Sequence, residues 1–320
     1  MRMQLIDKIR CPYCKSHLFS VENKKVNDQQ LVEGQIRCDG CKQSFPIDKG
    51  ILKFSINDKD LLREMAQWEV FADSEGWLGL NELYLESLPS GGSNILMKKD
   101  TIGWLSHEYN FFKMLEKVDV QNKLILDLGA GRCWSSKWIS LKGGDVVAFD
   151  SLTHPTIGLG AADVFIKNHD IHFDRVSGDF NELPFMDKVF DIVFSTGSLH
   201  HSVDIRRSLN EISRVLKPGG FLVLVNEPVL SVLKREEKIK MQGVQDGINE
   251  HAYRMTKLLS LFRQNKLKLR FINESLNVYE PGSPYYQGIL ASIINSTKLG
   301  KILSLAIRGG VLNCIAEKIS

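Results

Sequence analysis

The sequence predicts an α/β fold, in which helices pack on a mostly parallel sheet, with a small cysteine-rich module at the N-terminus. Three observations carry this prediction. An apolar run over Leu124 to Leu128 leads into a glycine turn, a second strand at 145–150 ends in an acidic residue, and two pairs of closely spaced cysteines precede both. A buried strand followed by a glycine turn and a helix is the unit that builds nucleotide sites in such sheets.

The turn after the first strand predicts an adenosine-containing ligand. Its two glycines allow a tight turn and a close approach of backbone to ligand, and a helix is expected to start at Arg132. Asp150 ends the next strand about 20 residues further on, where a carboxylate can accept hydrogen bonds from both ribose hydroxyls. A dinucleotide site would carry a third glycine where this chain has Trp134, so a nicotinamide cofactor is disfavoured.

The segment Leu126 to Gly131 resembles motif I of the class I S-adenosylmethionine-dependent methyltransferases. One departure is Cys133, which stands where that family usually has a further glycine. The resemblance continues in order along the chain. After a third strand over Ile171 to Val176, the run 177–180 is similar to the family's adenine site, and 183–195 is similar to its LPF-x-D-x-x-FD-x-V segment, which delivers a fourth strand over Phe190 to Ser195.

The remaining elements complete a Rossmann-like, seven-stranded class I methyltransferase sheet. A helix over Leu209 to Leu216 is stopped by the Lys-Pro-Gly-Gly run at 217–220, because proline lacks a backbone donor and glycine tolerates positive φ. A fifth strand over Phe221 to Val225 follows. Leu267 to Tyr279 is the expected sixth strand, and 309–318 is the expected last, antiparallel strand.

The resemblance implies S-adenosylmethionine as cofactor. Within it, Asp179 takes the exocyclic amine of adenine and Phe180 lies against the ring. The full set of expected cofactor-binding residues is Asp127, Gly129, Ala130, Gly131, Asp150, Ser151, Gly178, Asp179, Phe180 and Ser195.

The N-terminal cysteines predict a zinc site. Cys11 and Cys14 form one CxxC pair, and Cys38 and Cys41 form the other, close to the spacing of a four-cysteine zinc ribbon. Four sulfur ligands leave no position for water, so the ion would be structural. Redox dithiols or disulfides are the competing interpretation. They are disfavoured because no secretory signal precedes Cys11 and a cytoplasmic location is expected.

The segment after the second pair, 44–51, resembles the end of a small zinc-ribbon family whose members activate tRNA and protein methyltransferases as a separate subunit. A long loop over Asn23 to Glu33 is the departure. We therefore expect three parts. These are a zinc ribbon at 1–55, an aromatic-rich helical linker or lid at 56–118 with a turn at 90–93, and a methyltransferase domain at 119–320 with a lid insertion near 229–266.

Three histidines are candidates for a base at the methyl-transfer centre. His200 and His201 follow the fourth strand, and His251 precedes the expected lid helix. An oxygen nucleophile needs a base, and imidazole suits that task at neutral pH. The alternative role is to shape the pocket without taking a proton. Glu227, at the end of the fifth strand, is placed to orient a histidine.

Composition leaves the acceptor open. From Lys234 to Arg270 the chain holds ten Lys or Arg against four Asp or Glu, an excess of six, while the net charge of all 320 residues is only +3. This suggests an anionic partner, although a solvated helix face would look the same. The apolar stretch Ile302 to Ala316 is interrupted, so no transmembrane segment is expected.

Three functions remain. The favoured one is methyl transfer to a small or carrier-linked acceptor, at an oxygen of a sugar, a lipid-linked intermediate or a secondary metabolite. The second is base methylation of rRNA or tRNA, since a four-cysteine site also precedes some RNA methyltransferases. Against it, residues 1–60 are not strongly basic, and Ser-Thr-Gly-Ser at 195–198 replaces an amino-methylation motif. The third is a non-catalytic cofactor-binding interaction protein. The oligomeric state is left open.

Overall fold

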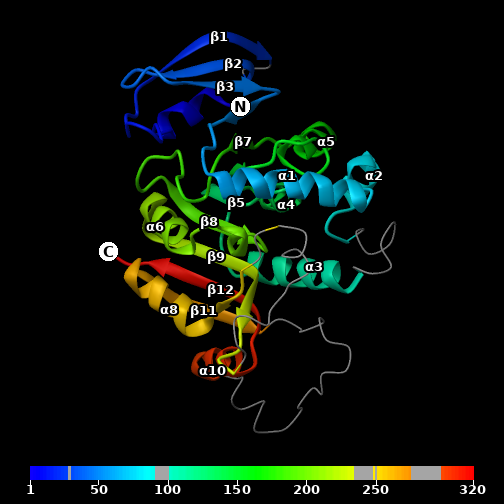
Figure 1. The fold of residues 1–320 in the computed structure, drawn as a ribbon, viewed down its shortest axis with the longest axis vertical. Coiled ribbons are helices and arrows are strands. Elements are labelled where there is room, and N and C mark those ends of the chain that lie inside the picture. The colour runs from blue at the N-terminus through cyan, green and yellow to red at the C-terminus, as the bar shows by residue number, and fades with distance from the viewer. Residues whose placement is uncertain (28–29, 91–100, 234–247, 249–250, 275–296) are drawn as a thin grey trace.

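The computed structural model describes residues 1–27, 30–90, 101–233, 248, 251–274 and 297–320 (Figure 1). Within these residues the chain forms one mixed sheet with helices on both faces. The strands are β1 (Phe19–Asn27), β2 (Gln30–Cys38), β3 (Ser44–Asp48), β4 (Ile51–Lys53), β5 (Leu124–Leu128), β6 (Asp145–Asp150), β7 (Asp174–Ser177), β8 (Phe190–Thr196), β9 (Leu216–Leu230), β10 (Tyr253–Arg254), β11 (Leu267–Glu274) and β12 (Gly310–Lys318).

The helices alternate with the strands of the second half of the chain, as expected for an α/β fold. The α-helices are α1 (Lys59–Ser74), α2 (Glu82–Ser87), α3 (Thr101–Leu115), α4 (Trp134–Leu141), α5 (Ala162–His169), α6 (Ile205–Val215), α8 (Met255–Gln264) and α10 (Lys298–Arg308). Short 3-10 turns are η1 (Met3–Lys8), η2 (Trp77–Gly79), η4 (Leu159–Ala161) and η5 (Leu199–His201). None of the helices in the described ranges is both long and apolar enough to cross a membrane.

The sheet is larger than the seven strands that the sequence predicts. In the described part of the chain it has 12 strands in the order β1-β2-β3-β4-β7-β6-β5-β8-β9-β12-β11, with β10 beside β9. The run from β7 to β11 contains the expected seven, and β12 is antiparallel to both of its neighbours. The other strands come mainly from the N-terminal module, which extends the same sheet because β4 pairs in parallel with the β7 edge.

The order reverses between β5 and β8, since β5 leads to β6 on one side and the chain later returns to β8 on the other. Ligands bind at the carboxyl ends of the strands at such a switch point. Alternate side chains of the central strands point to opposite faces, as Ile125 and Leu126 do. Helices α3, α4 and α5 pack on one face, and α6, α8 and α10 pack on the other.

Several boundaries differ from the predicted ones. The third strand begins at Asp174 rather than Ile171, and helix α4 begins at Trp134 rather than Arg132. Helix α6 ends at Val215, just before the Lys-Pro-Gly-Gly run. That run does not form a separate turn, because β9 already starts at Leu216. The run forms a bulge in β9 between Leu216, which pairs with Phe190 of β8, and Phe221, which pairs with Ile192.

The predicted loop over 23–33 is instead a hairpin. Strands β1 and β2 pair antiparallel from Phe19 with Cys38 to Asn27 with Gln30. The side chains of β1 are half-buried or exposed along its whole length, so the strand shows no apolar alternation by which sequence could reveal it.

In the expected lid insertion, 229–266, helix α8 packs its apolar face into the core, and residues 234–247 and 249–250 lie outside the described residues. Those gaps also contain much of the basic run from Lys234. The turn at 90–93, apart from Ser90, and the end of the expected sixth strand, 275–279, likewise lie outside them.

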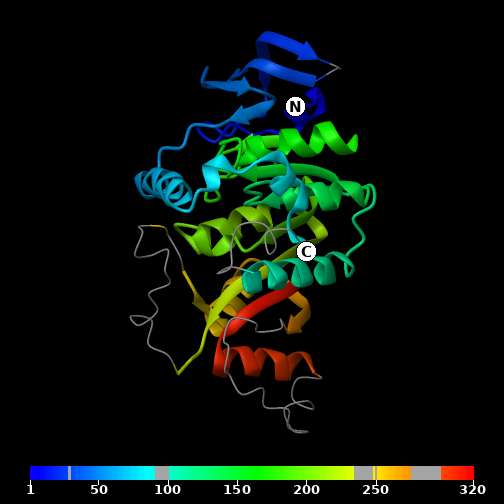
Figure 2. The same ribbon diagram turned by 90° about the vertical axis from the view of Figure 1, so that its right-hand side faces the viewer.

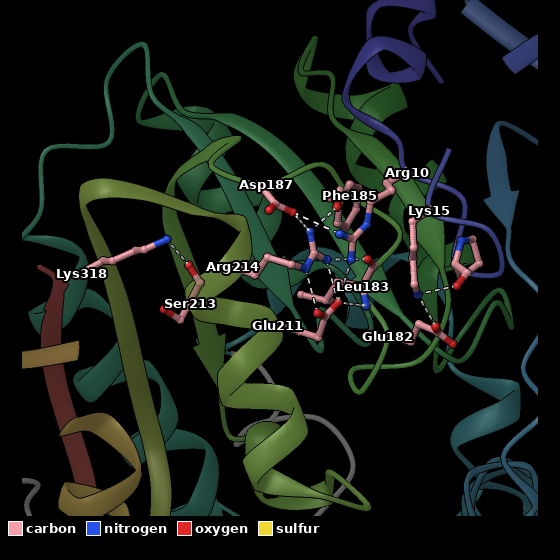
Figure 3. Close-up of polar contacts among 11 residues, drawn as sticks. Arg10, Lys15, Glu182, Leu183, Phe185, Asp187, Glu211, Ser213, Arg214 and Lys318 are labelled. Atoms are coloured by element: carbon pink, nitrogen blue, oxygen red, sulfur yellow. Dashed lines mark hydrogen bonds and ion pairs between the residues drawn. The ribbon is translucent and has the colours of Figure 1, made fainter. Parts of the chain in front are cut away.

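The N-terminal module also contacts the part of the chain that follows β7, through the first cysteine turn (Figure 3). Backbone hydrogen bonds join Arg10 N–H to the Pro184 carbonyl at 3.0 Å and Met186 N–H to the Lys8 carbonyl at 2.9 Å. Beside them, Lys15 forms an ion pair with Glu182 at 2.7 Å. The bonded residues Glu182, Pro184 and Met186 follow shortly after Phe180 in sequence. The module therefore holds the loop that leads away from the expected adenine site.

Candidate active site

A cavity of about 300 Å³ opens at the carboxyl ends of β5, β6, β7 and β8. It lies at the edge where an open α/β sheet of this order binds ligands. Of the expected cofactor residues, eight line it, and they come from three separate segments of the chain: Gly129, Ala130, Gly131, Asp150, Ser151, Gly178, Asp179 and Phe180.

The glycine turn is held tightly against the neighbouring strand ends. Gly129 has a φ of +75° and donates its N–H to the Phe149 carbonyl at 2.8 Å. A Cβ at position 129 would lie 2.3 Å from the Cβ of Ser198, so no larger residue fits. Gly131 also has a positive φ, but its missing side chain faces open space in the cavity. The turn therefore offers bare backbone to a ligand.

Cys133 keeps the backbone of the glycine that it replaces. Its φ is +61°, in the left-handed region that favours glycine, and its side chain is fully buried. Cys133 adopts this conformation at a modest cost in backbone strain.

Two carboxylates mark the two ends of the expected adenosine site. Asp150 accepts hydrogen bonds from the backbone N–H groups of Gly131 and Leu152, both at 2.9 Å. Asp179 accepts the Asn181 N–H at 2.7 Å. Burial raises the pKa of both carboxyl groups above the usual range for aspartate. Each carboxylate is thus fixed by backbone donors.

Two expected cofactor residues lie behind the cavity instead of on its wall. Asp127 is fully buried, and its Oδ2 accepts hydrogen bonds from Ser135 at 2.6 Å and Ser136 at 2.5 Å. Burial raises the pKa of Asp127 to about 6. Ser195 is also fully buried, and its hydroxyl pairs with that of Ser198 at 2.8 Å. Both residues hold the loops that form the wall.

Elements from the linker region cover the cavity. Figure 2 shows α1 beside the carboxyl ends of the central strands. Leu61, Glu64 and Trp68 of α1 line the cavity, together with Trp77 and Trp104. Three tryptophans of the linker region therefore lie in the wall of the cavity. Other aromatics of the linker, such as Phe111, pack in the core.

His200 and Glu227 form a buried unit next to the cavity. The Nδ1 of His200 lies 3.1 Å from Oε2 of Glu227, and Glu227 also accepts the backbone N–H groups of Ser198, Leu199 and His200. The prediction that Glu227 orients a histidine is confirmed for His200. Because His200 is not among the residues that line the cavity, this unit shapes the loop after β8.

His201 occupies a different position from its neighbour. It lines the cavity, and its Nδ1 lies 3.4 Å from Oε1 of Glu64 on α1. The ring also packs edge-on against Trp68, with a centroid distance of 5.6 Å. Sequence reasoning did not identify Glu64, because a glutamate in an amphipathic helix normally faces solvent and only the tertiary structure buries this one.

His251 contacts the turn after β8 through its backbone. Its N–H donates to the His200 carbonyl at 3.2 Å, while its side chain is exposed and is not part of the cavity wall. The structure therefore groups His201 with the cavity and leaves His251 outside it.

Arg132 is a second cavity residue whose side chain sequence reasoning did not single out. Its guanidinium lies 4.7 Å from the centre of the Trp77 ring and donates to the Thr156 carbonyl at 3.1 Å. It lines the cavity and places a positive charge beside the glycine turn. An arginine in the first residue after a glycine turn carries no recognisable pattern by itself.

The four N-terminal cysteines form one cluster, with all four sulfur atoms within 4.8 Å of one another. Sγ of Cys11 lies 3.6 Å from that of Cys41, and Sγ of Cys14 lies 3.4 Å from that of Cys38, so none is joined in a disulfide. Burial opposes ionisation of Cys38, but hydrogen bonds from the Cys41 backbone and the Cys14 thiol lower its pKa to about 7. This donor set suits a thiophilic metal ion.

Residues 126–224 match the family model of the methyltransferase domain. The match begins in β5 and ends in β9, so it includes the glycine turn, Asp150, Asp179 and both histidines after β8. This part of the chain is a methyltransferase domain of the S-adenosylmethionine-dependent type.

Two relatives are similar to part of the chain. Demethylmenaquinone methyltransferase of Clavibacter sepedonicus is 31% identical over 162 residues, which are 50% of this chain and 60% of that protein. The mitochondrial 2-methoxy-6-polyprenyl-1,4-benzoquinol methylase of Rattus norvegicus is 35% identical over 96 residues, 28% of this chain and 29% of that protein. The chain thus spans less than two thirds of the length of either relative.

A solved structure has the same fold. A chain in the complex between the Haloferax volcanii Trm112 methyltransferase activator and a putative methyltransferase superposes with a TM-score of 0.50 at 18% identity, and the match covers 67% of this chain and 90% of that one. At this identity the likeness concerns the fold alone.

Proposed function

We propose that the protein transfers the methyl group of S-adenosylmethionine to a small or carrier-linked acceptor, at an oxygen atom. One observation carries the proposal. A single cavity at the sheet switch point joins the glycine turn, Asp150 and the Asp179–Phe180 pair, which are the parts that an adenosine ligand needs.

In this proposal each end of the cofactor has its own partner. The Asp150 carboxylate, already fixed by two backbone N–H groups, accepts hydrogen bonds from the ribose hydroxyls. Asp179 accepts the exocyclic amine of adenine, and Phe180 packs against the ring. The bare backbone at Gly129 and Gly131 allows the cofactor to approach, while Ser151 and Gly178 complete the wall. Asp127 and Ser195 act indirectly, by holding the loops.

Bound S-adenosylmethionine would supply an activated methyl group, and the protein must align an acceptor with it in a straight line. The tryptophans and Leu61 on the covering side form an apolar wall that excludes water and can hold a ring or a lipid. Of the three candidate histidines, His201 is the one placed in that wall. His200 and His251 would then serve the structure of the site.

The acceptor class follows from the wall and the relatives together. The names of both relatives given above include a quinone or benzoquinol, and one includes a polyprenyl chain. A lipid-linked or aromatic hydroxyl compound suits the apolar side of this cavity better than a bare sugar does. The basic excess at 234–270 would favour a phosphate-bearing carrier.

We propose that the four cysteines hold a structural Zn²⁺. A tetrahedral site with zinc–sulfur bonds of about 2.3 Å places its sulfurs about 3.8 Å apart, and the cysteine cluster is close to that spacing. The expected result is one zinc per chain by atomic absorption. Cys14→Ser should lose that metal and lower the Tm, whereas Cys314→Ala, outside the cluster, should keep it. Full metal content in Cys14→Ser would contradict the assignment.

Methyl transfer can be tested without knowing the acceptor. Purified protein is incubated with tritiated S-adenosylmethionine and an extract of the source cell, which is then divided into RNA, small-molecule and lipid fractions. We expect label in the small-molecule or lipid fraction, and none when Asp150→Ala replaces the wild-type protein. Label in RNA that nuclease removes would overturn the proposal in favour of RNA methylation. An absence of label in every fraction, despite cofactor binding, would favour the non-catalytic alternative.

A further inference from the structure

We infer that Glu64 and His201 form the pair that removes a proton from the acceptor, with Glu64 as the positioning residue. This inference rests on the proposed function and deepens it. Glu64 comes from α1, outside the part of the chain that matches the methyltransferase domain, and His201 comes from the turn after β8. The two side chains meet in the wall of the cavity, 3.4 Å apart.

Glu64 carries an ionisable carboxyl group and is nevertheless buried. Its side chain is only 4% exposed, and it lies on a helix whose other cavity-lining residues include Leu61 and Trp68. An ionised carboxylate in an apolar wall is costly unless it interacts with a cation or hydrogen-bond donors. His201 is a donor at its Nδ1 and becomes a cation when it takes a proton. The free-energy cost of burying the Glu64 carboxylate is therefore lowest when His201 is protonated. This is the state that follows proton removal from an acceptor.

In this inference Nε2 of His201 is the reacting nitrogen. Nδ1 faces Oε1 of Glu64 at 3.4 Å, and a neutral tautomer with its proton on Nδ1 would leave Nε2 as the basic atom. The edge of Trp68 packs on the ring and limits its rotation. The neighbouring unit of His200 and Glu227 is separate, since Glu227 is engaged by His200 and three backbone N–H groups.

The chemical step balances with groups already named. The acceptor hydroxyl gives its proton to Nε2 of His201 as its oxygen forms a bond to the methyl carbon. The bond from that carbon to the cofactor sulfur breaks, and its electron pair stays on sulfur. The imidazolium is then stabilised by the Glu64 carboxylate until the proton leaves to solvent. The substrate class is thus an acceptor with an ionisable hydroxyl, which matches an aromatic or quinol-type hydroxyl.

The electrostatic surroundings of His201 include groups of both signs. Glu64 and Asp150 face it with carboxylates, while His200 and His251 are the imidazoles that lie near enough to interact with it. Of Glu64 and Asp150, Glu64 is the one in direct contact with His201, so we expect its removal to lower the pKa of His201 more.

The decisive measurement is the pKa of His201, from a pH titration of the histidine ring resonances by NMR, assigned with His201→Gln. We expect Glu64→Gln to lower this pKa by about one unit and Glu64→Asp to restore part of the shift. The matched control is Glu69→Gln, which makes the same charge change at an exposed position on the same helix. An unchanged pKa in Glu64→Gln would overturn the inference.

The second arm measures methyl transfer with the labelled cell fraction as acceptor. We expect His201→Gln to reduce the rate about 100-fold and Glu64→Gln about 10-fold, with the acid limb of the rate profile moved to lower pH in Glu64→Gln. Wild-type rate and pH profile in both variants would also overturn the pair. Isothermal titration with S-adenosylmethionine separates the two proposals. If the wild-type protein does not bind the cofactor, the proposed function is refuted. If it binds the cofactor but the pKa of His201 is the same in Glu64→Gln, only the pair is refuted.

Discussion

The two ends of the cavity are built in different ways. The proposed cofactor end consists of backbone at the carboxyl ends of β5, β6 and β7, with Asp150 and Asp179 each fixed by backbone N–H groups. The proposed acceptor end consists of side chains that converge from distant segments, such as Glu64 and Trp68 of α1 and His201 of the turn after β8. The first end is therefore set by the strand ends of the sheet, and the second by side chains from separate segments.

This difference has a consequence for energetics. Contacts made by backbone at strand ends tolerate few substitutions, because a side chain such as a methyl at Gly129 would collide with Ser198. Contacts made by converging side chains can be changed one at a time with the fold intact. Substitutions at the cofactor end should therefore affect cofactor affinity, and those at the acceptor end should affect rate.

The largest expected effect is that of Asp150→Ala on cofactor affinity. The change removes two charge-assisted hydrogen bonds to the ribose, together roughly 4 kcal/mol, or about 1000-fold in Kd. Isothermal titration with S-adenosylmethionine measures this directly. Asp73→Ala, at an exposed position on α1, is the control and should leave the affinity unchanged. An unaltered affinity in Asp150→Ala, with the circular dichroism of the folded protein, would mean that the cofactor end has been misplaced.

Glu227→Ala should act on stability instead. Glu227 is 5% exposed and accepts three backbone N–H groups as well as His200, so its loss leaves several buried donors without an acceptor. We expect the free energy of unfolding in urea to fall by about 3 kcal/mol. His201→Gln should change it by less than about 1 kcal/mol. An equal fall in the free energy of unfolding in Glu227→Ala and His201→Gln would contradict the assignment of His200 and Glu227 to a structural role and of His201 to the cavity wall.

Asp127 predicts a pH dependence of stability. Its pKa is about 6 in the folded protein, above the ordinary value near 4, so the folded state holds this proton more tightly than the unfolded state. The stabilisation is complete below about pH 4 and is lost as the pH rises through 6. We expect Asp127→Asn to remove a fall of roughly 2 kcal/mol between pH 4 and 7. The assignment would be contradicted if the free energy of unfolding in urea changed with pH in the same way in the wild-type protein and in Asp127→Asn.

The smallest effect is expected for Cys133→Gly. Glycine removes the backbone strain of a φ of +61°, which costs about 1 kcal/mol. It also removes a buried side chain whose burial stabilises the fold by a similar free energy. The net change in Tm should be slight and cofactor affinity should stay the same. A large loss of affinity would show that the thiol itself takes part in the site.

The sequence predicted the strands around the proposed cofactor end well for a physical reason. Buried parallel strands and positive-φ glycines leave strong local patterns, so β5, β6, β8 and the antiparallel β12 could be found within a residue or two. Asp127 and Ser195 belong to the same motifs, but whether a side chain faces the cavity or the loop behind it depends on tertiary packing. The structure turns both away from the cavity wall.

The acceptor end and the N-terminal extension could not be predicted in the same way. Glu64 shows no pattern because its burial arises from a contact between segments more than a hundred residues apart in sequence. The pairing of β4 with β7 depends on three residues of backbone, and the β1–β2 hairpin has largely exposed strands. Long-range pairing and convergent side chains leave no local periodicity.

The central claim is that this cavity binds S-adenosylmethionine, and isothermal titration of the zinc-loaded wild-type protein tests it most directly. The account predicts saturable binding of one cofactor per chain, which Asp150→Ala weakens about 1000-fold and Glu64→Gln preserves. Folded protein that releases no binding heat, or an affinity that survives Asp150→Ala unchanged, would contradict it.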